Sequence, residues 1–171
     1  MLEKFKESRD YIKTRTDVQP TIGIILGTGL GGLVNEINII DEIAYEDIPN
    51  FPVSTVQSHS GKLIFGELGG KHVIAMQGRF HFYEGYTLKE CTFPVRVMKL
   101  LGIECLIVSN ASGGVNPNYE VGDLMILNDH INLIPNPLVG ANIAELGPRF
   151  TDMSEPYCPT LIAKAEAVAK A

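Results

Sequence analysis

Three polar side chains alternate with aromatic ones in a short stretch bounded by glycines, and their types suit the binding of an anion. Arg79, His81 and Tyr83 are spaced two residues apart, so an extended backbone would point all three to one side. Arginine offers a planar fork of donors for phosphate, histidine a donor of tunable charge, and tyrosine a hydroxyl on an apolar ring. The alternative is a solvated edge strand with ordinary aromatic residues, and the stretch alone does not decide between the two.

A glycine-rich loop follows the first apolar run of the chain. Residues 21–26 are typical of a strand buried on both faces, and a Gly-x-Gly-x-x-Gly pattern begins directly after it at Gly27. Backbone amides in such a loop can approach a phosphate closely. The dinucleotide-binding version also needs a helix, a second strand and an acidic residue about 20 positions on. Only residues 30–37 are available for that helix, which disfavours NAD. The hydroxyl of Thr28 favours phosphate over a plain turn.

Two further loops offer groups for the same anion. His59 lies in a polar turn ahead of a predicted hairpin, where a lone histidine is more often a surface residue than a ligand. Ala111 follows a second buried strand predicted over 104–109, at the place where an α/β sheet binds its ligands. A simple strand-to-helix turn would give the same pattern. Composition and spacing thus allow the hypothesis that four loops meet around one anion, through Thr28, His59, Arg79 with His81, and the backbone at Ala111.

Other chemistries are disfavoured by composition and spacing. The four histidines include no i, i+4 pair and no cysteine companions, so we expect no metal site. Ser112 does not stand in a Gly-x-Ser-x-Gly motif, which leaves a serine hydrolase unsupported. A net charge of −6 provides no footprint for nucleic acid or an anionic membrane, and no apolar run approaches the ~20 residues of a membrane span. The odd number of widely spaced cysteines is typical of reduced thiols in a cytoplasmic protein.

The elements that must position these loops follow an α/β pattern. Strands are predicted over 21–26, 36–45, 62–68, 71–77, 104–109 and 123–127. Gly69 and Gly70 form a two-residue hairpin turn that suits positive φ. Helices are predicted over 2–16, 88–101 and 159–171. Thr87 is the expected N-cap of the second helix, Pro94 is expected to kink it or delay its start, and a long loop is expected over 135–158. Buried strands with intervening helices indicate a single α/β layered domain over residues 1–171.

Six motifs in order along the chain closely resemble those of the trimeric purine nucleoside phosphorylases. They occupy residues 26–33, 59–66, 77–86, 93–97, 109–117 and 121–132. The resemblance extends from about Thr21 to Pro156. It implies an α/β fold in which helices flank a central mixed β-sheet. It also implies reversible phosphorolysis, in which a purine ribonucleoside or deoxyribonucleoside and phosphate give the free purine and the sugar 1-phosphate. No cofactor and no metal are implied, because inorganic phosphate is a co-substrate.

The resemblance assigns roles to residues by matching position. Phosphate would be held by Thr28, His59, Arg79, His81 and the amide of Ala111, with His81 as the catalytic residue. Tyr83 would contact the ribose. Phe150 resembles the aromatic residue that caps the nucleoside site of a neighbouring subunit, which implies a homotrimer.

The resemblance covers only the N-terminal part of the family's pattern. The family's base-recognising glutamate, leaving-group asparagine, last phosphate serine and 5′-hydroxyl histidine would all follow Ala171. We therefore expect a C-terminally truncated domain that lacks phosphorolysis as an isolated 171-residue chain. Two alternatives stay open at this point: a methylthioadenosine phosphorylase, and a non-catalytic fragment that binds phosphate.

Overall fold

A computed structural model describes residues 1–52 and 61–171 of the chain. The chain divides into two compact units, Met1–Ala111 and Ser112–Ala171. The expectation of a single domain over residues 1–171 stays a prediction. His59, one of the expected phosphate ligands, lies outside the described residues.

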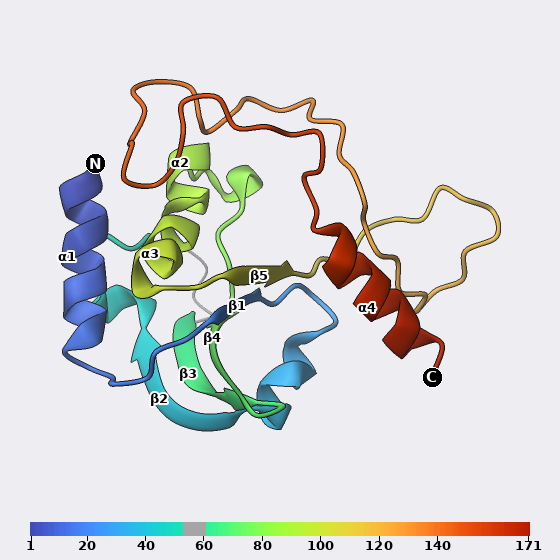
Figure 1. The fold of residues 1–171 in the computed structure, drawn as a ribbon, viewed down its shortest axis with the longest axis horizontal. Helices are drawn as coiled ribbons and strands as arrows, with labels where there is room; N and C mark the ends of the chain where they lie inside the picture. The colour runs from blue at the N-terminus through green and yellow to red at the C-terminus, as the bar shows by residue number, and fades with distance from the viewer. Residues whose placement is uncertain (53–60) are drawn as a thin grey trace. The chain divides into compact units, whose positions relative to one another are not determined.

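The first unit is built on a five-stranded mixed sheet in the order β2-β3-β4-β1-β5 (Figure 1). Its strands are β1 (Ile22–Ile25), β2 (Asn38–Ala44), β3 (Lys62–Leu68), β4 (Lys71–Gln77) and β5 (Cys105–Val108). Strand β1 runs parallel to both β4 and β5, whereas the β2–β3 and β3–β4 pairs are antiparallel. The α/β class with a mixed sheet is thereby confirmed. The carboxyl ends of the parallel strands β4, β1 and β5 lie side by side at the same end of the sheet.

The β3–β4 hairpin supplies the centre of the core. Its turn is made by Gly69 and Gly70, whose φ angles of 56° and 73° match the type I′ turn that follows the twist of the strands. Apolar residues of both strands are almost fully buried: Leu63, Ile64, Phe65, Val73, Ile74, Ala75 and Met76. The hairpin predicted from the sequence is confirmed in position, and both turn glycines have the expected positive φ.

The two faces of the sheet are covered differently. Ile24 of β1 packs in a cluster with Val34 of the short 3₁₀ segment Gly31–Glu36. The adjacent Gly23 faces the opposite way, because a Cβ built there would lie 3.2 Å from Sδ of Met98 in helix α3 (Phe93–Leu101). Helix α1 (Leu2–Lys13) packs against α3, with the rings of Phe5 and Phe93 4.8 Å apart.

The predicted helix over 88–101 forms as two helices. A capping box at Thr87 starts α2 (Leu88–Cys91): Thr87 Oγ1 accepts from the Glu90 amide at 3.3 Å, and Glu90 Oε2 accepts from the Thr87 amide at 2.7 Å. Helix α3 then begins with Pro94 in its first turn. Proline is tolerated there because its missing amide has no partner within the helix anyway. The cap and the interruption at Pro94 are both as predicted.

The chain after β1 does not form the crossover that a dinucleotide fold requires. The 3₁₀ segment Gly31–Glu36 leads straight into β2, which pairs antiparallel with β3 and with no other strand of the described sheet. A dinucleotide-binding unit instead needs a helix that returns the chain to a parallel strand. The topology of the described strands thus lacks the parallel crossover on which the dinucleotide interpretation of the glycine loop depends.

Two sequence predictions about strands are wrong. Residues 123–127 form no strand, because their backbone pairs with no neighbouring strand in the described part of the chain, and Leu124 is 85% exposed. Strand β5 forms as predicted but is not buried on both faces. It lies at the edge of the sheet, and Leu106, Ile107 and Val108 are exposed.

The second unit contains one helix among its described residues, α4 (Pro159–Ala169), preceded by a long irregular segment. That segment includes the loop predicted over 135–158. Across both units, no described helix has the length and apolar character needed to cross a membrane.

We expect Gly66→Ala to destabilise the first unit. A Cβ at Gly66 would lie 2.4 Å from the backbone oxygen of Asn38 and 2.7 Å from Cγ2 of Ile37. Strand β2 cannot yield without losing its pairing with β3, so overpacking should lower the free energy of unfolding by about 1–3 kcal/mol. Urea unfolding followed by circular dichroism measures the change. The matched control is Gly32→Ala, whose Cβ meets no described atom within 4 Å. Equal unfolding midpoints for the two variants would contradict this account.

Candidate anion-binding site

Three loops follow directly on the carboxyl ends of the three neighbouring parallel strands. The glycine loop at Gly27 follows β1, the loop carrying Arg79 follows β4, and the segment from Ser109 to Ala111 follows β5. This is the edge at which open α/β sheets bind ligands. The strand order therefore brings together segments that are up to about 80 residues apart in sequence.

Ser109 joins the first and third of these loops. Its Oγ accepts a hydrogen bond from the amide of Gly27 at 2.9 Å, and its own amide donates to the Ile25 carbonyl at 3.0 Å. The two backbones approach so closely that a Cβ at Gly27 would lie 2.3 Å from the Ser109 carbonyl oxygen. Only glycine fits at this position.

Arg79 joins the second loop to the third. Its Nη1 donates to the Ser109 carbonyl at 2.7 Å, and its Nε donates to Nε2 of His81 at 2.9 Å. No carboxylate of the described residues forms an ion pair with Arg79. The half-buried guanidinium is thus fixed by neutral acceptors, and its charge remains available to an anionic ligand.

His81 is held between a cation and a carboxylate. A guanidinium can only donate, so Nε2 of His81 must accept from Arg79 and carry no proton. The proton of the neutral imidazole then lies on Nδ1, which donates to Oε1 of Glu84. Glu84 therefore orients the ring and sets the tautomer that the Arg79 bond requires.

The side chains of Arg79, His81 and Tyr83 lie together as predicted, although Tyr83 belongs to the 3₁₀ segment Phe82–Glu84 and not to an extended backbone. Arg79 bonds to His81, and the rings of His81 and Tyr83 stack with centroids 4.7 Å apart. Phe80, which lies between the two basic residues, is buried on the other side. Its ring packs against Tyr45, with centroids 5.2 Å apart. Tyr83 itself is 82% exposed.

The remaining predicted site residues are less closely tied to this cluster. Thr28 is exposed and follows Gly27, and Ala111 is exposed two residues beyond Ser109. The Gly27–Ser109 hydrogen bond brings their loops together. Within residues 1–52 and 61–171, the hydrogen bonds of the Arg79 side chain go to His81 and Ser109 and not to Thr28 or Ala111. Phe150 is 88% exposed and belongs to the second unit.

Three residues of the site were missed by the sequence analysis: Ser109, Glu84 and Tyr45. Glu84 stands three residues after His81, close enough for a local pair, so the spacing did carry a signal. Ser109 could have been noted as the first polar residue after a strand. Tyr45 lies in the 3₁₀ segment Tyr45–Asp47, and nothing in its sequence neighbourhood connects it to the loop after β4.

No metal centre is indicated. Within residues 1–52 and 61–171, no three potential histidine, cysteine or carboxylate ligands gather at one point. All three cysteines are free thiols: Cys91, Cys105 and Cys158.

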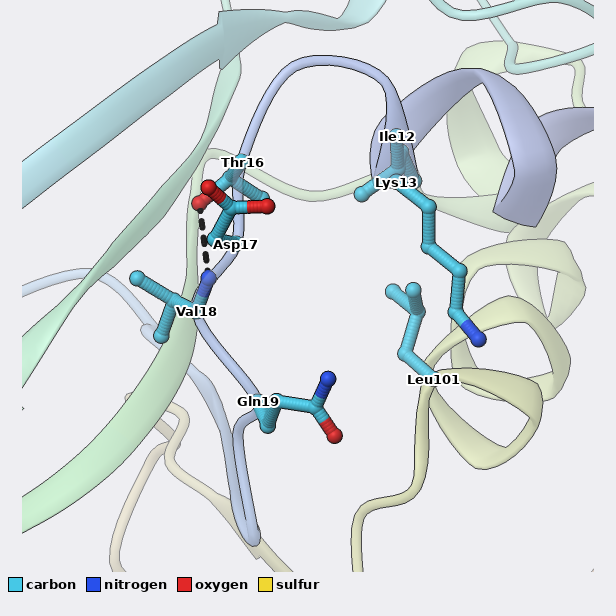
Figure 2. Close-up of a pocket in the computed structure, with 7 residues that line it drawn as sticks. All are labelled: Ile12, Lys13, Thr16, Asp17, Val18, Gln19 and Leu101. Carbon is cyan, nitrogen blue, oxygen red and sulfur yellow. Dashed lines mark hydrogen bonds between the residues drawn. The ribbon is translucent and has the colours of Figure 1, made fainter.

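A pocket exists elsewhere in the first unit. Figure 2 shows it between the end of α1, the segment that follows it, and the end of α3, where Ile12, Gln19 and Leu101 line it. Inside that segment, Thr16 Oγ1 accepts from the Val18 amide at 3.2 Å. These residues precede β1 and β5, so the pocket lies at the amino edge of the parallel strands. That is the opposite edge from the Arg79 cluster, and we assign it no ligand.

Comparisons with known proteins agree on one family. The family model described as the Phosphorylase superfamily matches residues 21–171. The protein named purine nucleoside phosphorylase 1 of Bacillus subtilis is 54% identical over 99% of this chain and 63% of its own length. A crystal structure of purine nucleoside phosphorylase from Schistosoma mansoni with acetate superimposes with a TM-score of 0.94 at 46% identity, over 99% of this chain and 64% of that one.

A second Schistosoma mansoni structure carries a relevant ligand. It is described as isoform 2 of purine nucleoside phosphorylase in complex with cytosine and ribose-1-phosphate. It matches with a TM-score of 0.92 at 45% identity, over 98% of this chain and 60% of that one. The chain thus spans about three fifths of the length of the relatives that it matches.

The Arg79–His81–Glu84 arrangement predicts the tautomer of His81. In protein labelled with ¹⁵N-histidine, a long-range ¹H–¹⁵N spectrum near pH 8 should show a protonated Nδ1 and an unprotonated Nε2. The spectrum of His81→Gln assigns the signal among those of the four histidines. In Arg79→Met the donor to Nε2 is lost, and the Nε2-protonated tautomer should increase. A proton on Nε2 in the unmodified chain would contradict the hydrogen-bond pattern.

Proposed function

Since this chain belongs to the Phosphorylase superfamily, we propose that the cluster around Arg79 binds inorganic phosphate as a substrate. The observation that carries this proposal is the Arg79 guanidinium, which bonds to the Ser109 carbonyl and to His81 and has no carboxylate partner among the described residues. A phosphate dianion is the ligand whose charge and planar pairs of oxygens suit such a guanidinium best. A protein of net charge −6 needs a locally built positive site to attract it.

For the whole protein we propose purine nucleoside phosphorylase activity. The support comes from relatives at 45–54% identity that carry this name, one of them solved with ribose-1-phosphate. An oxygen of phosphate attacks the anomeric carbon of a purine ribonucleoside or deoxyribonucleoside while the bond from that carbon to the base nitrogen breaks. The electron pair leaves with the purine, which takes up a proton. The products are the free purine and the sugar 1-phosphate.

This reaction forms no covalent bond to the protein. The side chains therefore act by orienting the nucleophile and by stabilising charge as the sugar passes through an oxocarbenium-like state. Phosphate oxygens are assigned to Thr28, His59, Arg79, His81 and the Ala111 amide. His81 can donate from Nε2 to a phosphate oxygen only when that nitrogen takes up a proton and gives up its bond from Arg79, and the bond from Nδ1 to Glu84 then keeps the ring oriented. In that role we assign His81 as the catalytic residue.

We assign contacts with the nucleoside to two aromatic residues. Tyr83 presents an exposed ring stacked on His81, which suits contact with the ribose beside the phosphate. Phe150 is exposed, and we assign it to the nucleoside site of a neighbouring subunit in a homotrimer. The proposal needs no cofactor and no metal, since phosphate itself is the nucleophile, and it places the reaction in the cytoplasm, where free thiols persist.

Two alternative functions must be distinguished from the proposed one by experiment. A methylthioadenosine phosphorylase would use the same phosphate cluster on another nucleoside. A non-catalytic phosphate-binding protein would use the cluster alone. Calorimetric titration separates them: heat with phosphate and inosine supports the proposed enzyme, heat with phosphate and methylthioadenosine supports the first alternative, and heat with phosphate alone supports the second. Binding of NAD alone would overturn all three.

Replacing Arg79 should weaken phosphate binding in a graded way. Arg79→Ala removes the charge and should raise the Kd for phosphate about 10-fold to 100-fold, since hydrogen bonds to charged groups contribute about 1.5–3 kcal/mol. Arg79→Lys keeps the charge but loses the fork geometry, and should fall in between. The charge-matched control is Arg9→Ala on α1, where Arg9 pairs with Asp10. An equal loss in Arg9→Ala and Arg79→Ala would point to net charge and against a local site.

A further inference from the structure

We propose that Tyr45 is a positioning residue of the phosphate site, whose hydroxyl holds the backbone at Gly78 so that Arg79 and His81 face the ligand. This inference rests on the proposed function, because it concerns the same phosphate. Tyr45 does not touch the phosphate in this account. It acts through the backbone of the loop that carries the two basic side chains.

The hydroxyl of Tyr45 donates a hydrogen bond to one backbone carbonyl, that of Gly78. Tyr45 Oη donates to the Gly78 carbonyl at 2.7 Å, and the residue is only 3% exposed. A buried hydroxyl without a partner is costly, so the pairing is strongly favoured once the ring is in place. Burial also raises the pKa of Tyr45 far above its usual value. The phenol therefore remains a donor throughout the neutral and mildly alkaline range.

The acceptor lies at the point where the loop leaves the sheet. Gly78 directly follows β4 and has a φ of +87°, a backbone conformation that only glycine adopts readily. A glycine there makes the turn possible but does not hold it in one conformation. The Tyr45 hydroxyl supplies that restraint on the peptide group that joins Gly78 to Arg79.

The ring of Tyr45 is itself held from several sides. Phe51 and Phe80 pack against it with centroid distances of 5.7 and 5.2 Å. The Tyr45 amide donates to the Gly61 carbonyl at 3.0 Å, and a Cβ at Gly61 would lie 2.3 Å from the ring. The hydroxyl is therefore a fixed point for Gly78. Phe80 adds a second restraint, because it packs on Tyr45 from between Arg79 and His81.

Packing alone does not account for a tyrosine at this position. A phenylalanine would keep the contacts with Phe51 and Phe80 and would bury no hydroxyl. What the hydroxyl adds is the bond to Gly78, one residue before Arg79. Arg79 in turn donates to both the Ser109 carbonyl and His81. Both hydrogen bonds form together only when the backbone at Arg79 is held in one conformation.

The test compares Tyr45→Phe with the unmodified chain by two readouts. Calorimetry with inorganic phosphate should show a Kd raised about twofold to tenfold, the range that corresponds to the net contribution of one hydrogen bond. The ¹⁵N signal of Arg79 Nε–H, measured without phosphate, should shift or broaden, because Arg79 no longer holds one position. The matched control is Ile12→Val, which removes one buried methylene from α1. It should leave both readouts unchanged although it also lowers stability.

The outcomes separate the two proposals. If the unmodified chain binds no phosphate, the proposed binding of phosphate at the Arg79 cluster is wrong, and the Arg79 Nε–H signal alone decides whether Tyr45 positions Arg79. If the unmodified chain binds phosphate and Tyr45→Phe matches it in both readouts, the inference is wrong and the proposed function stands. Should Tyr45→Phe fail to fold, Phe51→Leu withdraws a ring that packs on Tyr45 from outside the loop that carries Arg79. A shifted Arg79 signal with weaker phosphate binding in that variant supports the inference, and unchanged values overturn it.

Discussion

The carbonyl group of Ser109 accepts a hydrogen bond from Arg79 while the hydroxyl of the same residue accepts one from Gly27. Both bonds require the ends of β4, β1 and β5 to lie side by side, which in turn requires the parallel pairing of β1 with its two neighbours. The rest of the first unit supports that pairing. The hairpin positions β4, α3 covers Gly23 of β1, and the absence of a Cβ at Gly27 lets two backbones approach at the edge where the ligand is proposed to bind.

The electrostatics of the site follow from the same contacts. A guanidinium fixed by carbonyl and imidazole acceptors keeps its full charge, whereas one paired with a carboxylate would not. Among the described residues, Glu84 bonds to His81 and no carboxylate pairs with Arg79. The carboxylate of Glu84 therefore orients His81 and does not neutralise the charge of Arg79. An acidic chain can in this way present a localised positive group without a basic surface around it.

The sequence predicts local features of this fold well and long-range ones poorly. The Gly69–Gly70 turn and the Thr87 cap were predicted because the residues that determine them are adjacent in sequence. Arg79 and His81 were singled out for their residue types and their spacing. Ser109 and Tyr45 were missed because their roles arise from hydrogen bonds to residues 30 and 33 positions away. The strand predicted over 123–127 failed for a related reason, since an apolar run forms a strand only against a partner that no local pattern can supply.

Strand β5 has a further consequence for how the chain behaves in solution. Its pairing with β1 uses one side of its backbone, and within the described part of the chain no strand pairs with the other side. The apolar side chains of Leu106, Ile107 and Val108 are exposed along it. An open edge with apolar side chains and no charged residue is a template for strand addition. A second copy of this chain that paired along β5 would extend the sheet and cover these side chains.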